Sequence, residues 1–221
     1  MYAGPLLLED DHIMENVKYL DNSINKINEV VIEDNREMVE KFFQKNKDRI
    51  KIYLTLGFTN PPEISARARQ CIQYLLKRNA AVITNTKAFQ EPHIYGDQYF
   101  YSPFLPMDQV CSKVDLMIHH CGSGTYNYQI KHQVCGIALG SKCYDRDEVA
   151  SQLQSLNALI YIPADYNDDL FYEQFYKAVD ILLNKSSREI AEQKMALSLL
   201  SLETKRYDAE FNIEKTVQNL F

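Results

Sequence analysis

The stretch that decides the fold is Val114–Thr125, VDLMIHHCGSGT. An apolar run, Val114–Ile118, stops at two histidines, and a short turn with two glycines leads into residues typical of a helix. A short apolar strand, a glycine-containing turn and a helix are typical of the repeating unit of a parallel sheet. The stretch therefore predicts a buried strand whose carboxyl end opens directly onto a helix N-terminus.

The same alternation continues on both sides of this stretch. Further strands are expected at 50–56, 80–84, 98–101, 136–139 and 159–162, and helices at 34–45, 61–78, 125–133, 147–156, 168–183, 186–206 and 209–220, with a brief helical turn after Pro106. Short apolar strands separated by helices imply a sheet covered on both faces. We predict an α/β fold: residues 31–221 form a single doubly wound, mostly parallel, Rossmann-like domain closed by C-terminal helices, and residues 1–30 form a linker leading into it.

Composition and charge exclude several classes of protein. The 221-residue chain has a net charge of −6, without the basic stripe that a nucleic-acid partner requires. It has five cysteines, an odd number, with no Cys-x-x-Cys pair, which fits a reducing cytoplasm. No apolar run approaches the roughly 18 residues of a membrane span, and the N-terminus lacks the basic region of a signal peptide. We therefore expect a cytoplasmic protein.

The first candidate site is the turn itself, because ligands of open parallel sheets bind beyond the carboxyl ends of the strands. Gly122 and Gly124 permit close backbone approach, and the N–H groups and dipole of the next helix favour an anion. His120 could add a hydrogen bond or a positive charge to a diphosphate, and the Thr125 hydroxyl a further hydrogen bond. The equal alternative is an ordinary turn, with Thr125 as helix cap and the histidines as loop residues.

Two other segments follow strands and could face the same crevice. Gly57–Asn60 comes directly after the strand at 50–56, and Phe104–Met107 follows the strand at 98–101. An exposed aromatic such as Phe104 could stack on a base. Taken singly, each has a simpler explanation: the first is a turn leading into a helix, and the second is a core phenylalanine beside a proline turn.

Rival motifs do not fit the residues. A dinucleotide fingerprint would need a third glycine at Asn127, and Gly136–Lys142 is too short for a Walker loop. A nucleophile elbow would need glycines at Cys121 and Thr125. The consecutive residues His119–Cys121 point their side chains apart and cannot readily share a metal ion. We interpret Cys121 as a buried cysteine and not as a nucleophile.

Asp115 in an apolar strand, followed by His120–Thr125 (HCGSGT), resembles the signature of the UDP-glycosyltransferase family, in its C-terminal, donor-binding GT-B domain. Three weaker segments resemble that domain in the same order: YAGPLL at 2–7, IYLTLGFT at 52–59 and FLPM at 104–107. Together they cover about residues 2–183. The resemblance implies the following roles: the diphosphate is held by His120, Gly122, Ser123, Gly124 and Thr125, the base lies against Phe104, and the phosphates and interdomain cleft border Gly57 and Thr59.

The sequence departs from the family pattern where the ribose and the sugar would bind. Tyr128, with Gln129 beside it, stands where the family has a ribose-binding glutamate, and Met107 replaces a glutamine. Gln133-Val134-Cys135 replaces Gly-Val-Pro. The sugar-binding pair Asp-Gln becomes Asp145-Arg146, which indicates either an acidic or phosphorylated donor sugar or an arginine on the surface.

The resemblance implies the donor half of an inverting, metal-independent glycosyltransferase (a hexosyltransferase), with a UDP-sugar or dTDP-sugar as substrate and no cofactor. The chain has no room for the acceptor-binding domain, so we expect an N-terminal domain or partner subunit to supply it, and we expect the chain alone to transfer nothing. The helix at 209–220 would present an apolar face to that partner or pack on its own domain.

Three alternatives remain open on the sequence. The substituted ribose and sugar positions favour a catalytically degenerate GT-B-like module that binds a nucleotide or a partner. A sugar-nucleotide epimerase would need both domains and a carboxylate pair that we cannot place. A dinucleotide-dependent oxidoreductase lacks its third glycine.

Overall fold

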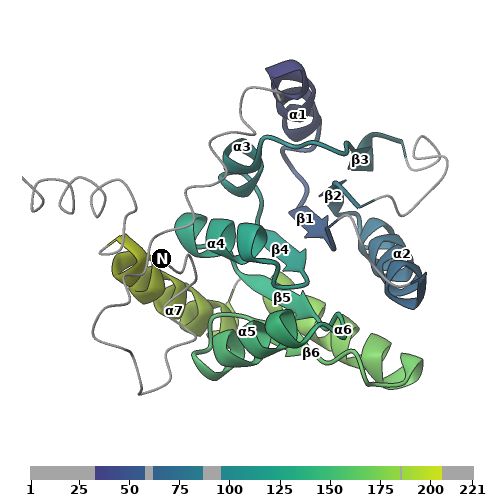
Figure 1. Cartoon of the computed structure of the whole chain (residues 1–221). Coiled ribbons are helices and arrows are strands. Elements are labelled where there is room, and N and C mark those ends of the chain that lie inside the picture. The colour runs from purple at the N-terminus through teal and green to yellow at the C-terminus, as the bar shows by residue number, and fades with distance from the viewer. Residues whose placement is uncertain (1–32, 58–61, 87–95, 185, 206–221) are drawn as a thin grey trace, which may run out of the picture.

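The computed structural model describes residues 33–57, 62–86, 96–184 and 186–205. Its centre is a six-stranded sheet in the order β3-β2-β1-β4-β5-β6, with every neighbouring pair parallel (Figure 1). The strands are β1 (Lys51–Thr55), β2 (Ala81–Thr84), β3 (Tyr99–Tyr101), β4 (Leu116–His119), β5 (Gly136–Leu139) and β6 (Ile160–Ile162). The sheet confirms the predicted α/β, doubly wound, Rossmann-like fold.

Helices cover both faces of the sheet. They are α1 (Glu33–Lys45), α2 (Pro62–Lys77), α3 (Met107–Cys111), α4 (Ser123–His132), α5 (Tyr144–Ser155), α6 (Asp168–Leu183) and α7 (Arg188–Lys205). On β1, Ile52 and Leu54 pack toward α2 and α6, whereas Tyr53 between them packs toward α1 and α3. This alternation, with both sets apolar, is the physical reason for a strand buried on two sides.

The strand order reverses at the middle of the sheet. From β1 the chain moves outward to β2 and β3, returns to pair β4 with β1, and then continues to β5 and β6. Thr55 at the end of β1 lies in register with His119 at the end of β4. Connections leave these two ends in opposite directions, so a crevice opens beyond them, where ligands of this fold class bind.

Two helices begin earlier than the sequence predicts. α4 begins at Ser123 and not at Thr125, and α5 begins at Tyr144 and not at Asp147. Gly124 and the polar residues around it are poor helix formers, but a first turn tolerates them because its N–H groups need no partner within the helix. The remaining described elements lie within about two residues of their predicted bounds. The expected linker at 1–30 and the expected helix at 209–220 lie outside the described residues.

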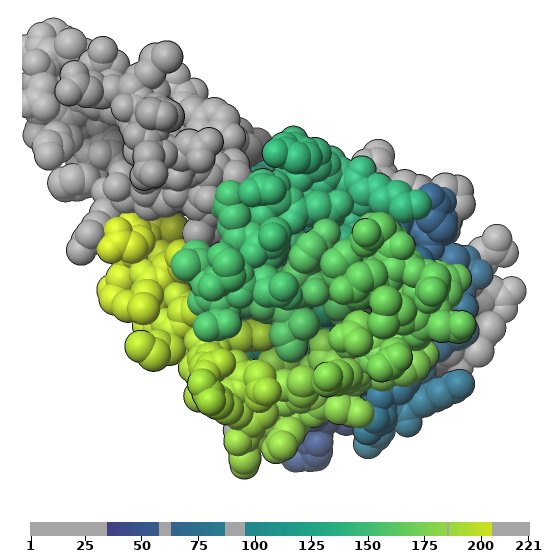
Figure 2. Space-filling model, turned by 90° about the horizontal axis from the view of Figure 1, so that it is seen from below, coloured from purple at the N-terminus to yellow at the C-terminus, as the bar shows by residue number. Residues whose placement is uncertain are grey.

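The closing helices complete the domain. The Nε2 and Oε1 atoms of Gln193 on α7 face the first residue of β5, and Oε1 accepts a hydrogen bond from the Gly136 N–H group at 2.9 Å. In Figure 2, seen from below, the second half of the chain forms most of the visible face, with α7 in yellow at one side. Among the described residues, no helix combines the length and apolar character that crossing a membrane would require.

Candidate functional site

His119 and His120 end β4 but have different environments. The His119 ring is fully buried, its Nε2 lies 2.7 Å from Gln129 Oε1, and its Nδ1 accepts a hydrogen bond from the Cys121 N–H group at 3.1 Å. These partners require the neutral ring with its proton on Nε2. Burial lowers the pKa of His119 to about 4, against the hydrogen bond to Gln129. His119 therefore holds the turn together and is not available to a ligand.

His120 follows the last residue of β4, and its ring lies between the turns that follow β1 and β4, against Gly57 and Gly122. A Cβ atom on either Gly57 or Gly122 would lie 3.2 Å from both the Cε1 and Nε2 atoms of its ring, so a larger residue at either position would have to move the ring by a few tenths of an ångström. The side chain is buried, and its Nδ1 has no hydrogen-bond partner of normal geometry within the described residues. The Thr55 backbone at the end of β1 still lies close enough to the ring to act on its pKa as a hydrogen-bond acceptor does.

His120 is neutral at physiological pH. Burial is the main cause that lowers its pKa to about 4, followed by the positive charge of Arg146 and by His119, while the Thr55 backbone raises it less. The sequence led us to expect either a hydrogen bond or a positive charge from His120. The neutral ring of the free protein can make the hydrogen bond but carries no positive charge.

The first turn of α4 supplies unpaired backbone donors. Gly122 is the N-cap, in an extended conformation, and its carbonyl accepts hydrogen bonds from the N–H groups of Thr125 at 2.8 Å and Tyr126 at 3.1 Å. Within the described part of the chain, no hydrogen bond uses the N–H groups of Ser123 and Gly124. The alternative with Thr125 as cap is therefore wrong, and the donors available to an anion are those of Ser123 and Gly124.

Cys121 makes the sharp turn between strand and helix. Its φ is +53°, in the left-handed region that non-glycine residues rarely adopt. The thiol is buried, and burial followed by the charge of Asp147 raises its pKa, so it stays protonated. This confirms the interpretation of Cys121 as a packed residue.

The segment after β1 meets the same crevice. Gly57 has φ +71° and lies against the His120 ring, as the order of the strands predicts. Its N–H group donates to Thr55 Oγ1 at 3.2 Å, which fixes the start of the turn. Thr59, the other residue expected here, lies outside the described residues.

Phe104 is exposed and not part of the core, so the core alternative for this residue is wrong. Its side chain is 54% exposed, and its carbonyl accepts hydrogen bonds from Asn35 Nδ2 and Ser102 Oγ, each at 2.8 Å. An exposed aromatic residue of this kind can stack on a base. Met107, at the start of α3, is instead partly buried against the core cluster that packs on α1.

The residues around the expected ribose position contact protein. Tyr128 packs on the same core cluster as Met107, and its ring stacks on His132 with a centroid distance of 6.2 Å. Gln129 is buried, with its Oε1 facing His119 and its Nε2 donating to the Ala158 carbonyl at 3.2 Å. Gln129 is thus a structural residue whose role the sequence pattern did not predict.

The loop between β5 and α5 brings Asp145 and Arg146 to the crevice side of the sheet. Asp147 Oδ1 accepts from the Ser141 N–H group at 2.9 Å, which closes the loop onto the first turn of α5. Asp145 is exposed, whereas Arg146 is half-buried and lies close enough to His120 for its charge to lower that pKa.

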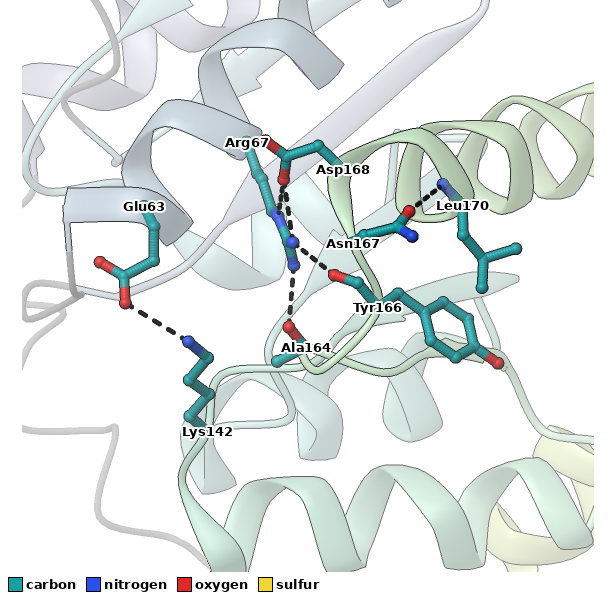
Figure 3. Close-up of polar contacts among 8 residues, drawn as sticks. All are labelled: Glu63, Arg67, Lys142, Ala164, Tyr166, Asn167, Asp168 and Leu170. Carbon is teal, nitrogen blue, oxygen red and sulfur yellow. Dashed lines mark hydrogen bonds and ion pairs between the residues drawn. The ribbon is translucent and has the colours of Figure 1, made fainter.

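An arginine on α2 holds the adjoining loops in place (Figure 3). Arg67 donates to the carbonyls of Ala164 at 3.0 Å and Tyr166 at 2.6 Å and pairs with Asp168 at 2.9 Å, so it joins α2 to the start of α6. Beside it, Lys142 pairs with Glu63 at 3.5 Å. Arg67 was not predicted from the sequence, because its partners lie about a hundred residues away and no local pattern marks them.

Among the described residues, no group of three or more His, Cys, Asp or Glu side chains is placed to hold a metal ion.

Comparison with solved structures finds the same fold in several glycosyltransferases. The chain is similar to the glycosyltransferase VinC in complex with dTDP (18% identity, TM-score 0.56, covering 77% of this chain and 41% of that one). It is also similar to the calicheamicin glycosyltransferase CalG4 (14%, 0.59, 78% and 42%) and the spinosyn rhamnosyltransferase SpnG (17%, 0.60, 77% and 45%).

The chain has the Rossmann-like fold of GT-B glycosyltransferases. It spans less than half the length of these neighbours. No protein-family model matches the sequence, and no curated protein matches it either. The likeness is therefore one of fold, and the chemistry rests on the residues of the crevice.

Proposed function

We propose that the chain is the nucleotide-sugar-binding half of an inverting, metal-independent glycosyltransferase whose acceptor site lies on another domain or subunit. The observation that carries the proposal is the pair of N–H groups of Ser123 and Gly124, which no hydrogen bond uses within the described residues, beside the His120 ring that packs against Gly57 and Gly122. Neutral donors converging at a helix N-terminus suit a diphosphate. The solved structures of VinC and SsfS6 contain dTDP and thymidine diphosphate respectively, which supports a nucleoside diphosphate as the ligand class.

The site's chemistry would be stabilisation of a leaving group. In a single displacement, an acceptor hydroxyl attacks the anomeric carbon, the bond from that carbon to the diphosphate oxygen breaks, and negative charge grows on the diphosphate. Fixed donors at that point lower the barrier in place of a metal ion. In this chain the donors are the backbone N–H groups of the first α4 turn, the dipole of that helix and one N–H of His120.

The base that deprotonates the acceptor would come from the other domain. The chain covers only 41–45% of its structural neighbours, which leaves room in such a protein for a domain of similar size. We therefore expect the chain by itself to bind UDP or dTDP and a donor UDP-sugar or dTDP-sugar, without transferring the sugar.

A titration by calorimetry tests this function. UDP, dTDP and NADH are titrated into the native chain, the His120→Ala variant and the His132→Ala variant. His132 is the matched control, because it lies at the opposite end of α4 and contacts Asp108 at 2.9 Å. The expected result is saturable UDP or dTDP binding that weakens at least tenfold in His120→Ala and stays within twofold in His132→Ala. Absence of nucleoside diphosphate binding by the folded native chain contradicts the proposal.

A second candidate is a nucleotide-binding module without catalysis. It is favoured by Tyr128, which packs on the protein core where the family would place a ribose-binding carboxylate. An assay of the protein joined to its acceptor domain distinguishes the two candidate functions. UDP binding without sugar transfer supports the module, and turnover supports the enzyme.

A further inference from the structure

The buried side chain of Gln129 connects the interior of the domain to the turn that precedes α4. Gln129 lies in the second turn of α4 and is 1% exposed. Its Oε1 atom lies 2.7 Å from His119 Nε2 at the end of β4, and its Nε2 atom donates to the Ala158 carbonyl at 3.2 Å. Leaving either end of a buried amide without a partner is costly, so both contacts hold the side chain in place.

The hydrogen bonds that lead from Ala158 to Cys121 can run in only one direction. The Ala158 carbonyl can only accept, so the Nε2 end of the Gln129 amide faces it and the Oε1 end faces His119. His119 must then carry its proton on Nε2, which leaves Nδ1 as an acceptor. The Cys121 N–H group, which can only donate, lies 3.1 Å from that Nδ1. Gln129 thus selects the tautomer of His119 that the turn requires.

The turn needs this support because its backbone conformation is unfavourable. Cys121 has φ +53°, which a residue other than glycine adopts at a cost. The next residue, Gly122, is the N-cap of α4, and the N–H groups of Ser123 and Gly124, which no hydrogen bond uses within the described residues, follow it directly. A rotation of the Cys121 backbone would change the direction of these N–H groups. The acceptor on His119 therefore fixes where an anion can be held.

Gly136, the first residue of β5, makes room for the amide of Gln129. A Cβ atom at this position would lie 2.3 Å from Gln129 Nε2 and 2.8 Å from its Cδ atom. A larger residue would displace the amide from its two partners. Since the φ of Gly136 is not positive, alanine can adopt its backbone conformation. A substitution at Gly136 can therefore disturb the same hydrogen bonds without changing Gln129 itself.

Resting on the proposed function, we propose that Gln129 is a positioning residue for the diphosphate, which through His119 directs the N–H groups of Ser123 and Gly124 at the ligand. A binding site keeps its affinity only while its donors are held close to the productive geometry by the residues behind them. Because Gln129 is buried, it acts through His119 and not by contact with the ligand.

The test compares UDP binding, measured by calorimetry, in the native chain and in the variants Gln129→Met and Gln193→Met. Methionine is similar in length to glutamine and has only a weak acceptor in place of the amide. Gln193 is the matched control, because it is also buried and binds the Gly136 backbone, but makes no hydrogen bond to the turn within the described part of the chain. We expect UDP to bind at least tenfold more weakly to Gln129→Met and within twofold of native to Gln193→Met, although both variants should lose stability in urea.

Nitrogen-15 chemical shifts of the His119 ring test the hydrogen bonds without any ligand. The native chain should show a protonated Nε2 and an unprotonated Nδ1, and Gln129→Met should lose this preference. Gly136→Ala, which displaces the amide, should weaken UDP binding in the same direction as Gln129→Met.

Several results would overturn the inference. Native UDP affinity in folded Gln129→Met would do so and leave the proposed function intact, and if Gln129→Met does not fold, native affinity in Gly136→Ala has the same meaning. Equal weakening of UDP binding in Gln129→Met and Gln193→Met would make the effect one of general stability. A His119 ring that carries its proton on Nδ1 in the native chain would contradict the direction of the hydrogen bonds. No UDP binding by the folded native chain refutes the proposed function itself, and this inference with it.

Discussion

At the scale of single residues, the pKa values of His119 and His120 make the free energy of unfolding depend on pH. Both have a pKa lowered to about 4 by burial, whereas an unfolded chain titrates them near 6.5. As the pH falls from 6.5 to 4, the unfolded chain therefore binds two protons that the folded chain excludes, and the free energy of unfolding falls. The expected loss is roughly 2–3 kcal/mol for each histidine.

Urea unfolding at pH 7 and pH 4.5 measures this dependence. His120→Gln should remove about half of it, because Gln keeps a polar side chain but does not titrate. A native protein whose stability is the same at both pH values contradicts the neutral, buried state of the two rings.

Gly140 is the residue at which a single methyl group should be most harmful. A Cβ atom there would lie 2.3 Å from the Ala164 nitrogen, and main chain cannot move aside as a flexible side chain can. We expect Gly140→Ala to reduce the free energy of unfolding by about 2–3 kcal/mol through overpacking. Gly96→Ala is the control: φ is +56° and nothing lies within 4 Å, so only the backbone cost of about 1 kcal/mol is expected. The denaturant midpoints of the two variants show whether the loss of stability comes from the close approach of a Cβ atom to Ala164 or from the backbone conformation of the glycine.

At the scale of elements, Arg67 joins α2 to the loop that precedes α6. Its side chain is 12% exposed, and its guanidinium binds two carbonyls and a carboxylate, so Arg67→Met leaves the Ala164 and Tyr166 carbonyls without that partner. The expected cost is roughly 2–4 kcal/mol in thermal or urea unfolding. Arg188→Met, which breaks only an exposed pair within α7, should cost under about 0.5 kcal/mol. Equal losses of stability in the two variants would show that Arg67 does not hold α2 to the loop that precedes α6.

Local patterns predicted the elements well and their junctions less well. β5 was predicted at its observed bounds, Gly136–Leu139. The starts of α4 and α5 were placed too late, since Ser123, Gly124 and Tyr144–Arg146 have no apolar periodicity of their own. Helix starts are set by which N–H groups the surrounding turn leaves free, and sequence alone does not show that.

At the scale of the whole molecule, the strand order explains which features of the candidate site could be predicted from the sequence. The position of β4 beside β1 brings His120 against Gly57, and both residues were singled out because each follows an apolar strand. The buried partners of His119, the pairing of Gln193 with Gly136 and the neutral state of His120 depend on contacts between distant segments. No local sequence pattern could predict those features.

The central claim is that a diphosphate binds the first turn of α4. Amide chemical shifts from ¹⁵N-labelled protein, recorded with increasing UDP or dTDP, test it most directly. We predict saturable changes in the chemical shifts of the Ser123 and Gly124 N–H groups. The chemical shifts of α7, where Gln193 binds the amino end of β5, should change little. Saturating nucleotide that leaves the Ser123 and Gly124 amides unshifted would contradict the account.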